Sequence, residues 1–259
     1  MRGMAARRKG AAGRYGLGIL LLLGLWAVAA QLADSPTLPG PAAVAAAIVS
    51  ESAGGQLPYH LGMTLWRVAA AFLLALSIGT AIGVVMGRSR PLDDLLGPWL
   101  LLTLNVPALV VIILAYVWMG LTEAAAITAV SINKIPNVVV TVRQGALAAD
   151  EKLFDMARVY RMGRYETLRH VLIPQLQPYL LAASRTGLSL IWKIVLVVEL
   201  LGRSDGVGFQ MHLFFQLFDI TRLLAYTLAF VAVAQLIEMA VLVPVETHAG
   251  RWRVARSDA

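Results

Sequence analysis

Long apolar blocks recur along the chain and are separated by short polar segments. A helix that crosses a bilayer needs about 20 predominantly apolar residues. We predict membrane-spanning helices at residues 16–33, 61–87, 95–119, 124–142, 175–201 and 223–245. A short helix is expected at residues 42–52, in the loop after the first block. The predicted fold class is therefore all-α, a polytopic bundle of about six transmembrane helices.

Composition supports a membrane protein over a soluble one. The 259 residues are 59% hydrophobic and 14% charged, whereas soluble domains carry about 25% charged residues. We expect one folded unit in three parts. A basic amino-terminal segment covers residues 1–15, a transmembrane domain covers 16–245 with a polar loop at 143–174, and a basic tail covers 246–259.

The distribution of Lys and Arg predicts the orientation. In membrane proteins these residues concentrate in cytoplasmic loops. With the amino terminus inside, 16 of the 22 Lys and Arg residues lie on the cytoplasmic side. Only Arg67, Arg203 and Arg222 fall outside, near span ends. Both termini are therefore predicted to be cytoplasmic, and the net charge of +7 is explained without a nucleic-acid partner.

Several classes of site are not expected. The sequence has no Cys, and its four histidines lack the spacing of metal ligands, so neither a metal site nor a cofactor is predicted. No cluster of residues suggests a catalytic centre. A cleaved secretory signal is the alternative for the first block, because Ala27-Val28-Ala29 resembles a cleavage site. That block is longer than the apolar core of about 7–15 residues typical of signals, so a retained span is favoured.

The segment from Asp150 to Arg169 is the one long polar stretch with partial helical periodicity. Asp150 can cap its start, and Pro174 is expected to end it before the fifth span. We predict a short helical hairpin on the cytoplasmic membrane surface. Two interpretations stay open from the residues alone: an interfacial helix that anchors the loop to lipid headgroups, or a docking element for a cytoplasmic partner.

This segment resembles the EAA loop of bacterial ABC importer permeases, whose pattern is Glu-Ala-Ala, a Gly six residues after the Glu, and Ile-x-Leu-Pro. Asp155-Met156-Ala157 and Pro174 match it with the family's spacing of nineteen residues. The departures are Asp155 for Glu, Met156 for Ala, and Arg161 at the Gly position. Residues 37–253 are also similar to the nitrate/sulfonate/taurine-type branch, in the stretches TLPGPAAVAAAI, HLGMTLWRVAAAF, GVVMGRSRPLDDLLGPWL, VWMG and IWKIVLVVELLGRSDGVG.

The resemblance implies a type I ABC importer permease in the bacterial plasma (inner) membrane. The implied partners are a second permease copy, two cytoplasmic ATP-binding subunits, an extracytoplasmic substrate-binding protein and membrane lipid. It implies that the loop couples to the ATPase. The implied coupling residues are Asp155, Met156, Ala157, Arg158, Arg161, Gly163, Ile173 and Pro174. The chain lacks the G-x-x-x-x-G-K-[ST] phosphate loop, so ATP hydrolysis is expected on a separate subunit.

Charged and polar residues within the predicted spans are candidates for a translocation path. An ionised side chain near the bilayer centre costs about 2.5–3.5 kcal/mol even on lenient scales, so it should face the bundle interior or water. The candidates are Asn133, Lys134, Arg185, Lys193 and Glu199. One interpretation is a path for a small anionic solute. The other is that Lys134 or Lys193 pairs with Glu199 or Glu238 between helices.

Two other functions are alternatives to an importer permease. A membrane-embedded enzyme needs clustered His, Asp, Glu or Ser at one depth, and the sequence has none. A secondary transporter driven by an ion gradient is the second alternative. It is less favoured because the spans lack mid-membrane carboxylates suited to a proton relay.

Overall fold

The protein is an all-helical bundle in the computed structural model, which describes residues 2–242 and 244, with side chains at 17–240 and 244. Its α-helices are α1 (Arg2–Ala33), α2 (Pro41–Ala53), α3 (Gln56–Arg88), α4 (Arg90–Asn105), α5 (Ala108–Met119), α6 (Glu123–Leu147), α7 (Glu151–Val159), α8 (Arg164–Thr167), α9 (Ile173–Gly202), α10 (Val207–Gln216) and α11 (Ile220–Ile237). Two π-helical turns, η1 (Leu168–Leu172) and η2 (Glu238–Leu242), extend α8 and α11.

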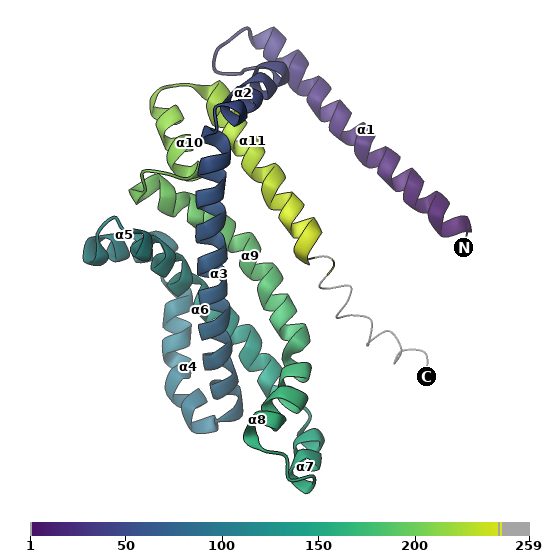
Figure 1. The fold of residues 1–259 in the computed structure, drawn as a ribbon, viewed down its shortest axis with the longest axis vertical. Coiled ribbons are helices and arrows are strands. Elements are labelled where there is room, and N and C mark those ends of the chain that lie inside the picture. The colour runs from purple at the N-terminus through teal and green to yellow at the C-terminus, as the bar shows by residue number, and fades with distance from the viewer. Residues whose placement is uncertain (1, 243, 245–259) are drawn as a thin grey trace.

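Helices α3, α6 and α9 form the core of the bundle (Figure 1). Three glycines spaced four residues apart on α3 contact α6 in matching order: Gly79 meets Val138, Gly83 meets Val142 and Gly87 meets Ala146. The two helices are therefore parallel. Glycine lets helices approach closely in lipid, and these three glycines allow α3 and α6 to pack closely together.

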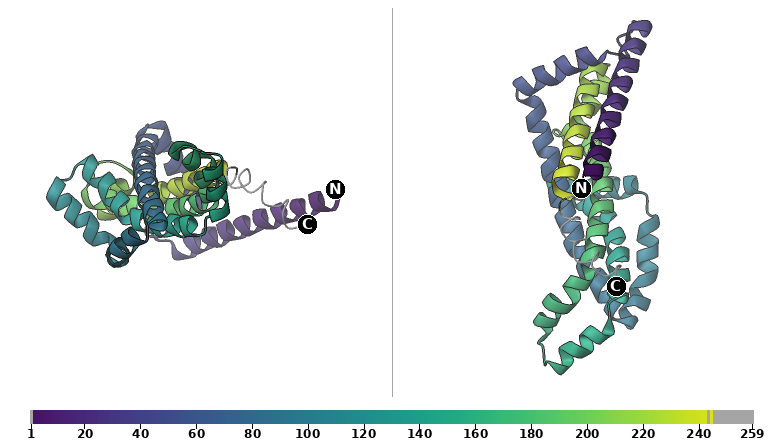
Figure 2. Two further views of the ribbon diagram at one scale, coloured as in Figure 1. Left: turned by 90° about the horizontal axis from the view of Figure 1, so that it is seen from below. Right: turned by 90° about the vertical axis from the view of Figure 1, so that its right-hand side faces the viewer.

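Helix α9 crosses this pair in the opposite direction. Gly145, late in α6, packs against Tyr179 early in α9, whereas Lys134 lies beside Gly187, further along α9. The bundle thus has two ends. One holds α7 and α8, and the other holds α2 and α10 (Figures 1 and 2).

The third predicted span is a bent pair of helices. Helices α4 and α5 meet at 96°, where Pro107 follows the extended residue Val106. Proline lacks the amide donor and disfavours helical geometry in the residue before it. Because α3 and α6 are parallel, α4 and α5 together return the chain to the α2 end. By length and composition, four described helices could span a membrane, or five if the bent pair counts as one.

The first predicted span corresponds to α1, whose described apolar part is Leu17–Ala33. This helix stands apart from the bundle and leans on α2 (Figures 1 and 2). Trp26 Nε1 donates a hydrogen bond to Pro39 O at 3.0 Å, which fixes the connection. Leu32 is 83% exposed, so α1 presents an uncovered apolar surface. Its role as a span stays a prediction.

One detail of the sequence prediction is wrong. Pro174 does not end the polar segment, because residues Arg164–Gly202 form one continuous helical stretch. Pro174 is the second residue of α9 and directly follows η1 within this stretch, so the proline there lacks the amide donor of an i→i−4 hydrogen bond. The basic tail at 246–259 and the side chains of residues 1–15 lie outside the described residues.

The α3–α6 contact makes a testable prediction. A Cβ on Gly83 would lie 2.9 Å from both Val139 O and Val142 Cβ, so Gly83→Ala should lower the free energy of unfolding by about 1–3 kcal/mol through overpacking. Gly62→Ala is the matched control, because nothing lies within 4 Å of its added Cβ. Thermal unfolding of the detergent-purified chain should show a lower midpoint for the first variant only. Equal midpoints would contradict the close packing.

Candidate functional site

The predicted hairpin is present and consists of α7, the turn after it, and α8. Asp150 caps α7, as predicted, by accepting a hydrogen bond from Lys152 N at 2.9 Å. Its own amide donates to Gln175 Oε1 at 2.7 Å. The start of the hairpin is therefore tied to the start of α9.

The turn after α7 explains why the family pattern has glycine at the position of Arg161. Met162 N donates to Ala157 O at 2.9 Å, and Arg161 N donates to Arg158 O at 3.0 Å. This is a Schellman motif, whose reversing residue adopts a left-handed conformation that favours glycine. Arg161 has φ = +52°, so it holds the glycine conformation at a steric cost. Gly163 N then donates to Glu166 Oε2 at 3.0 Å as α8 begins.

The hairpin is fixed to the bundle by an aromatic and ionic clamp. The guanidinium of Arg88, at the end of α3, lies 4.1 Å from the Phe154 ring centroid and pairs with Glu151 at 2.6 Å. Phe154 and Ala157 belong to a buried apolar cluster that includes Val171 in η1, directly before α9. The hairpin should therefore move as one body with α3 and α9.

The outer face of the hairpin is uncovered and combines charged and apolar side chains. Asp155 and Arg158 form an exposed ion pair at 2.8 Å, worth about 0–1 kcal/mol in such a setting. Val159 and Tyr160 are 79% and 75% exposed. Of the predicted coupling residues, Ala157 is buried, whereas Met156, Arg161 and Gly163 are exposed on this element. Ile173 and Pro174 lie apart from it, on the first turn of α9.

The predicted path residues do not form one constellation. Lys134 belongs to α6, is 2% exposed and packs against the side of α9 that carries Gly187. Its Cε would lie 3.1 Å from a Cβ added to Gly187. Arg185 and Lys193 are exposed, on another side of α9. Asn133 is half-buried in α6. Glu199 is fully buried, near the far end of α9.

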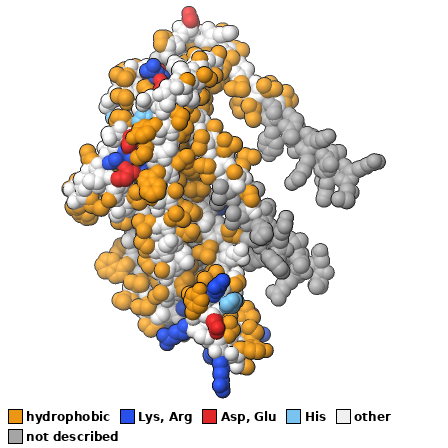
Figure 3. All heavy atoms as spheres, in the orientation of Figure 1, with side chains coloured by type: hydrophobic (Ala, Val, Ile, Leu, Met, Phe, Trp, Pro, Cys, Tyr) orange, Lys and Arg blue, Asp and Glu red, His pale blue; other side chains and the backbone are white. Residues whose placement is uncertain are grey.

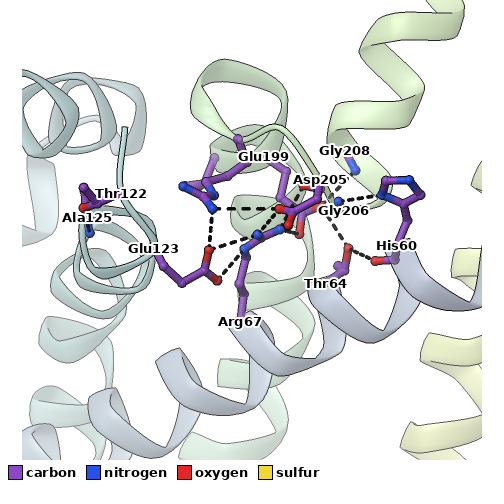
Figure 4. Close-up of polar contacts among 12 residues, drawn as sticks. His60, Thr64, Arg67, Thr122, Glu123, Ala125, Glu199, Asp205, Gly206 and Gly208 are labelled. Atoms are coloured by element: carbon purple, nitrogen blue, oxygen red, sulfur yellow. Dashed lines mark hydrogen bonds and ion pairs between the residues drawn. The ribbon is translucent and has the colours of Figure 1, made fainter. Parts of the chain in front are cut away.

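The structure instead reveals a buried charge cluster at the α2 end, here called the Arg67 cluster (Figure 4). Arg67 donates to both carboxylate oxygens of Glu123 at 2.8 and 3.0 Å, to Glu199 Oε1 at 2.7 Å, and to Asp205 O at 3.0 Å and its carboxylate. A second arginine, Arg203, pairs with Glu123 at 2.8 Å. All five donors of the Arg67 guanidinium are thus accounted for.

The other side of Glu199 is closed by the loop before α10. Glu199 Oε2 accepts from Thr64 Oγ1 at 2.9 Å and from Gly208 N at 2.8 Å. Gly206, at φ = +101°, donates to His60 Nδ1 at 3.0 Å. A side chain at Gly206 would collide with the Glu199 carboxylate, so both the positive φ and the close contact require glycine there.

Sequence reasoning missed this cluster. Arg67 was placed near an outer span end, yet it is 1% exposed and buried in α3. His60, Thr64 and Arg67 are spaced four and three residues apart in an otherwise apolar block. That spacing puts them on one helix face and was the available signal. Glu199 pairs with Arg67 and not with Lys134 or Lys193, so neither of the ion pairs considered for Glu199 in the sequence forms. Among the described residues, no group of His, Asp and Glu could hold a metal ion.

Comparison with known proteins identifies the family. The model of the binding-protein-dependent transport system inner membrane component matches residues 75–243. The chain belongs to this family. The putative aliphatic sulfonates transport permease SsuC of Bacillus subtilis is 29% identical over 96% of this chain and 92% of its own. The taurine transport permease TauC of Escherichia coli is 28% identical over 74% and 72%, respectively. The nitrate import permease NrtB of Synechococcus elongatus is 27% identical over 73% and 71%.

A solved structure shares the fold. A chain of the inward-facing MetNI methionine ABC transporter superposes with a TM-score of 0.64 at 18% identity, covering 75% of this chain and 98% of its own. The predictions of an all-α, type I importer permease fold, of the nitrate/sulfonate/taurine-type ABC permease family and of a multi-pass protein of the bacterial plasma membrane are confirmed.

Within this permease the Arg67 cluster should act as a stability element. Arg67→Met leaves buried carboxylates without their counter-ion, which typically costs about 3–5 kcal/mol. We expect a strongly lowered thermal midpoint and reduced yield of folded protein. Arg158→Met is the matched control, because its pair with Asp155 is exposed and its loss should cost about 0–1 kcal/mol. Similar midpoints for the two variants would show that the cluster is not a main support.

Proposed function

We propose that two copies of this chain form the translocation path of an ABC importer for a small anionic solute. Two cytoplasmic ATP-binding subunits would grip the α7–α8 hairpins, and a binding protein would deliver the solute from outside. The observation that carries this proposal is an exposed hairpin rigidly clamped to two long helices. The chain itself would not hydrolyse ATP, because its sequence lacks a phosphate loop.

The orientation is supported by charge in three dimensions. Basic residues gather at the α7 end, visible as the blue patches at the bottom of Figure 3, while hydrophobic side chains dominate the middle. The basic residues at this end are Arg88, Arg90, Arg143, Lys152, Arg158, Arg161, Arg164 and Arg169. The opposite end has Arg67, Arg203 and Arg222, all three engaged with carboxylates. The positive-inside rule then favours a cytoplasmic α7 end.

The docking role follows from how the hairpin is held. An element that merely rests on lipid headgroups would need no rigid connection to the spans. Here Arg88, Phe154 and Glu151 join the hairpin to α3, and η1 continues it into α9. A partner that displaces the hairpin would therefore displace α9, which reaches the opposite end of the bundle. The exposed Val159 and Tyr160 add apolar area typical of interface anchors.

The path is assigned to the exposed side of α9. Arg185, Ser189 and Lys193 are exposed there, about one to two turns apart. Charged side chains at membrane depth avoid lipid and mark water-filled routes or partners. A second copy apposed along this side would enclose a polar, basic channel. Relatives named for sulfonate, taurine and nitrate transport fit a solute with an anionic sulfonate or nitrate group.

The docking role predicts the effect of two substitutions. Asp155→Lys reverses an exposed charge without touching the core, and Arg161→Gly removes a side chain while favouring the left-handed turn. Both should abolish association with the ATPase subunits or uncouple hydrolysis from uptake, with membrane insertion and thermal midpoint retained. Asp94→Lys, an exposed reversal on α4, is the control. Normal co-purification and uptake for both hairpin variants would rule out docking at these side chains.

The path role predicts the effect of charge at Lys193. Lys193→Gln in the assembled transporter should lower solute-stimulated uptake about tenfold or more, since a hydrogen bond to a charged group is worth about 1.5–3 kcal/mol. Lys193→Arg, which keeps the charge, should retain most uptake. Proteoliposomes with the cognate binding protein provide the assay. Equal uptake by both variants would contradict the anion path. Uptake without ATP, driven by a proton gradient, would favour a secondary transporter.

A further inference from the structure

Helix α6 carries a stripe of side-chain amides on a side that α3 does not cover. Asn133, Asn137 and Gln144 are spaced by four and seven residues, so they lie within an arc of about 40° on one helix face. Asn137 and Gln144 are exposed, and Asn133 is half-buried. None of these amides forms a hydrogen bond with another described residue. Val142, which packs against Gly83 of α3, lies about 140° round α6 from Asn137.

Helix α9 has a matching polar face. Thr186 and Lys193 are exposed and seven residues apart, so they lie on one side of the helix, about 100–120° round it from Gly187. Gly187 faces α6, where Lys134 lies. Glu199, which accepts a hydrogen bond from α3, lies about 120° from Gly187 in the other direction. The polar side of α9 therefore also points away from α3.

The two stripes border one face of the α6–α9 pair. Helices α3, α6 and α9 pack against one another, and each stripe occupies the side of its helix that neither partner covers. Asn137 lies only about 60° round α6 from Lys134, which contacts α9 at Gly187. Because that contact sets the depth, Asn133 lies about level with Ser189, which is exposed on α9. The amides of α6 and the polar side of α9 thus line the same surface.

This surface has hydrogen-bond donors and a cation, and its two helices bring no carboxylate to it. Helix α6 has no Asp or Glu after Glu123, and α9 has none before Glu199. Both of those carboxylates pair with Arg67 at the α2 end. An amide group donates two hydrogen bonds without carrying charge. Polar side chains at membrane depth avoid lipid and mark water-filled routes or partners. The surface therefore fits a small anion with oxygen acceptors.

We propose that Asn133 and Asn137 form a second wall of the translocation path and donate hydrogen bonds to an oxyanion group of the solute. This inference rests on the proposed importer function and extends its path from α9 to α6. Lys193 supplies the attraction for an anion, and the neutral amides add contacts to its oxygens. The amides hold the solute without a further ion pair, so its release is not prevented.

Access of single cysteines tests the α6 wall, because the chain has no Cys of its own. Asn137→Cys and Lys193→Cys are placed in the assembled transporter with Cys-free partner subunits, and each is treated with an anionic or a cationic methanethiosulfonate of similar size. We expect both cysteines to be labelled. At Asn137→Cys the anionic reagent should react about tenfold faster, because Lys193 is retained there and attracts it.

Ile132→Cys is the matched control for labelling. Ile132 is 49% exposed in the isolated chain, but it lines the apolar groove between α3, α4 and α6, on another side of α6. It should react with neither reagent. Labelling of Ile132→Cys as fast as Asn137→Cys would show that access does not follow the polar face, and it would contradict the proposal.

Uptake of the solute gives a second readout. Asn137→Leu should lower uptake about tenfold, the loss expected when a hydrogen bond to a charged group is removed. Asn137→Gln keeps the amide and should retain most uptake. Both variants should keep the thermal midpoint, because the Asn137 side chain bonds to no other described residue. Equal uptake by the two variants would contradict a contact with the solute.

The labelling results separate this inference from the function on which it rests. If Lys193→Cys is labelled and Asn137→Cys is not, the path along α9 stands and the α6 wall is refuted. If neither is labelled, the proposed path itself fails. A disulfide that joins two copies through Asn137→Cys would show that this face is packed between copies, and it would also refute the α6 wall.

Discussion

One buried guanidinium, that of Arg67, organises the α2 end of this permease. It joins α3 to α6 through Glu123 and to α9 through Glu199, and it reaches the loop before α10 through Asp205. Removing these charges from water is costly, and only dense hydrogen bonding offsets it. Glu199 meets this condition with Thr64 and Gly208 as further donors. The cluster therefore fixes the relative positions of three helices at the α2 end, in addition to the close glycine contacts along their length.

A second set of contacts, the Arg88 clamp, holds the opposite end of the bundle. There the Arg88 guanidinium lies over Phe154 and pairs with Glu151. Helix α9 connects the two ends, because it is continuous with the hairpin through η1 and carries Glu199 near its last turn. A force applied to the hairpin would reach the Arg67 cluster along one helix. The π-helical turn at Leu168–Leu172 lies on this route, and such turns often mark functional sites.

The length of the apolar blocks and the capping residues made the long helices predictable. The pairing of residues far apart in the sequence was not predictable. Asp150 was recognised as a cap because its side chain acts within two residues. Arg67 and Glu199 are 132 residues apart, and no local pattern states that they meet. The prediction that Pro174 ends the polar segment failed, because a proline at a helix end and one inside a continuous helical stretch cannot be told apart from the local sequence. The α7–α8 hairpin was found through a family pattern, while its Schellman turn needed coordinates.

The Arg67 cluster also bears on the charge of the translocation path. Glu199 was a candidate counter-ion for Lys134 or Lys193, but all its strong contacts go to Arg67, Thr64 and Gly208. Lys134, buried beside Gly187, donates no hydrogen bond to the described side chains and forms no ion pair with them. Glu238, the remaining acidic candidate, lies in η2 beyond α11. Because Glu199 is committed to the Arg67 cluster, it does not neutralise Lys134 or Lys193, and this supports the proposed path for an anionic solute.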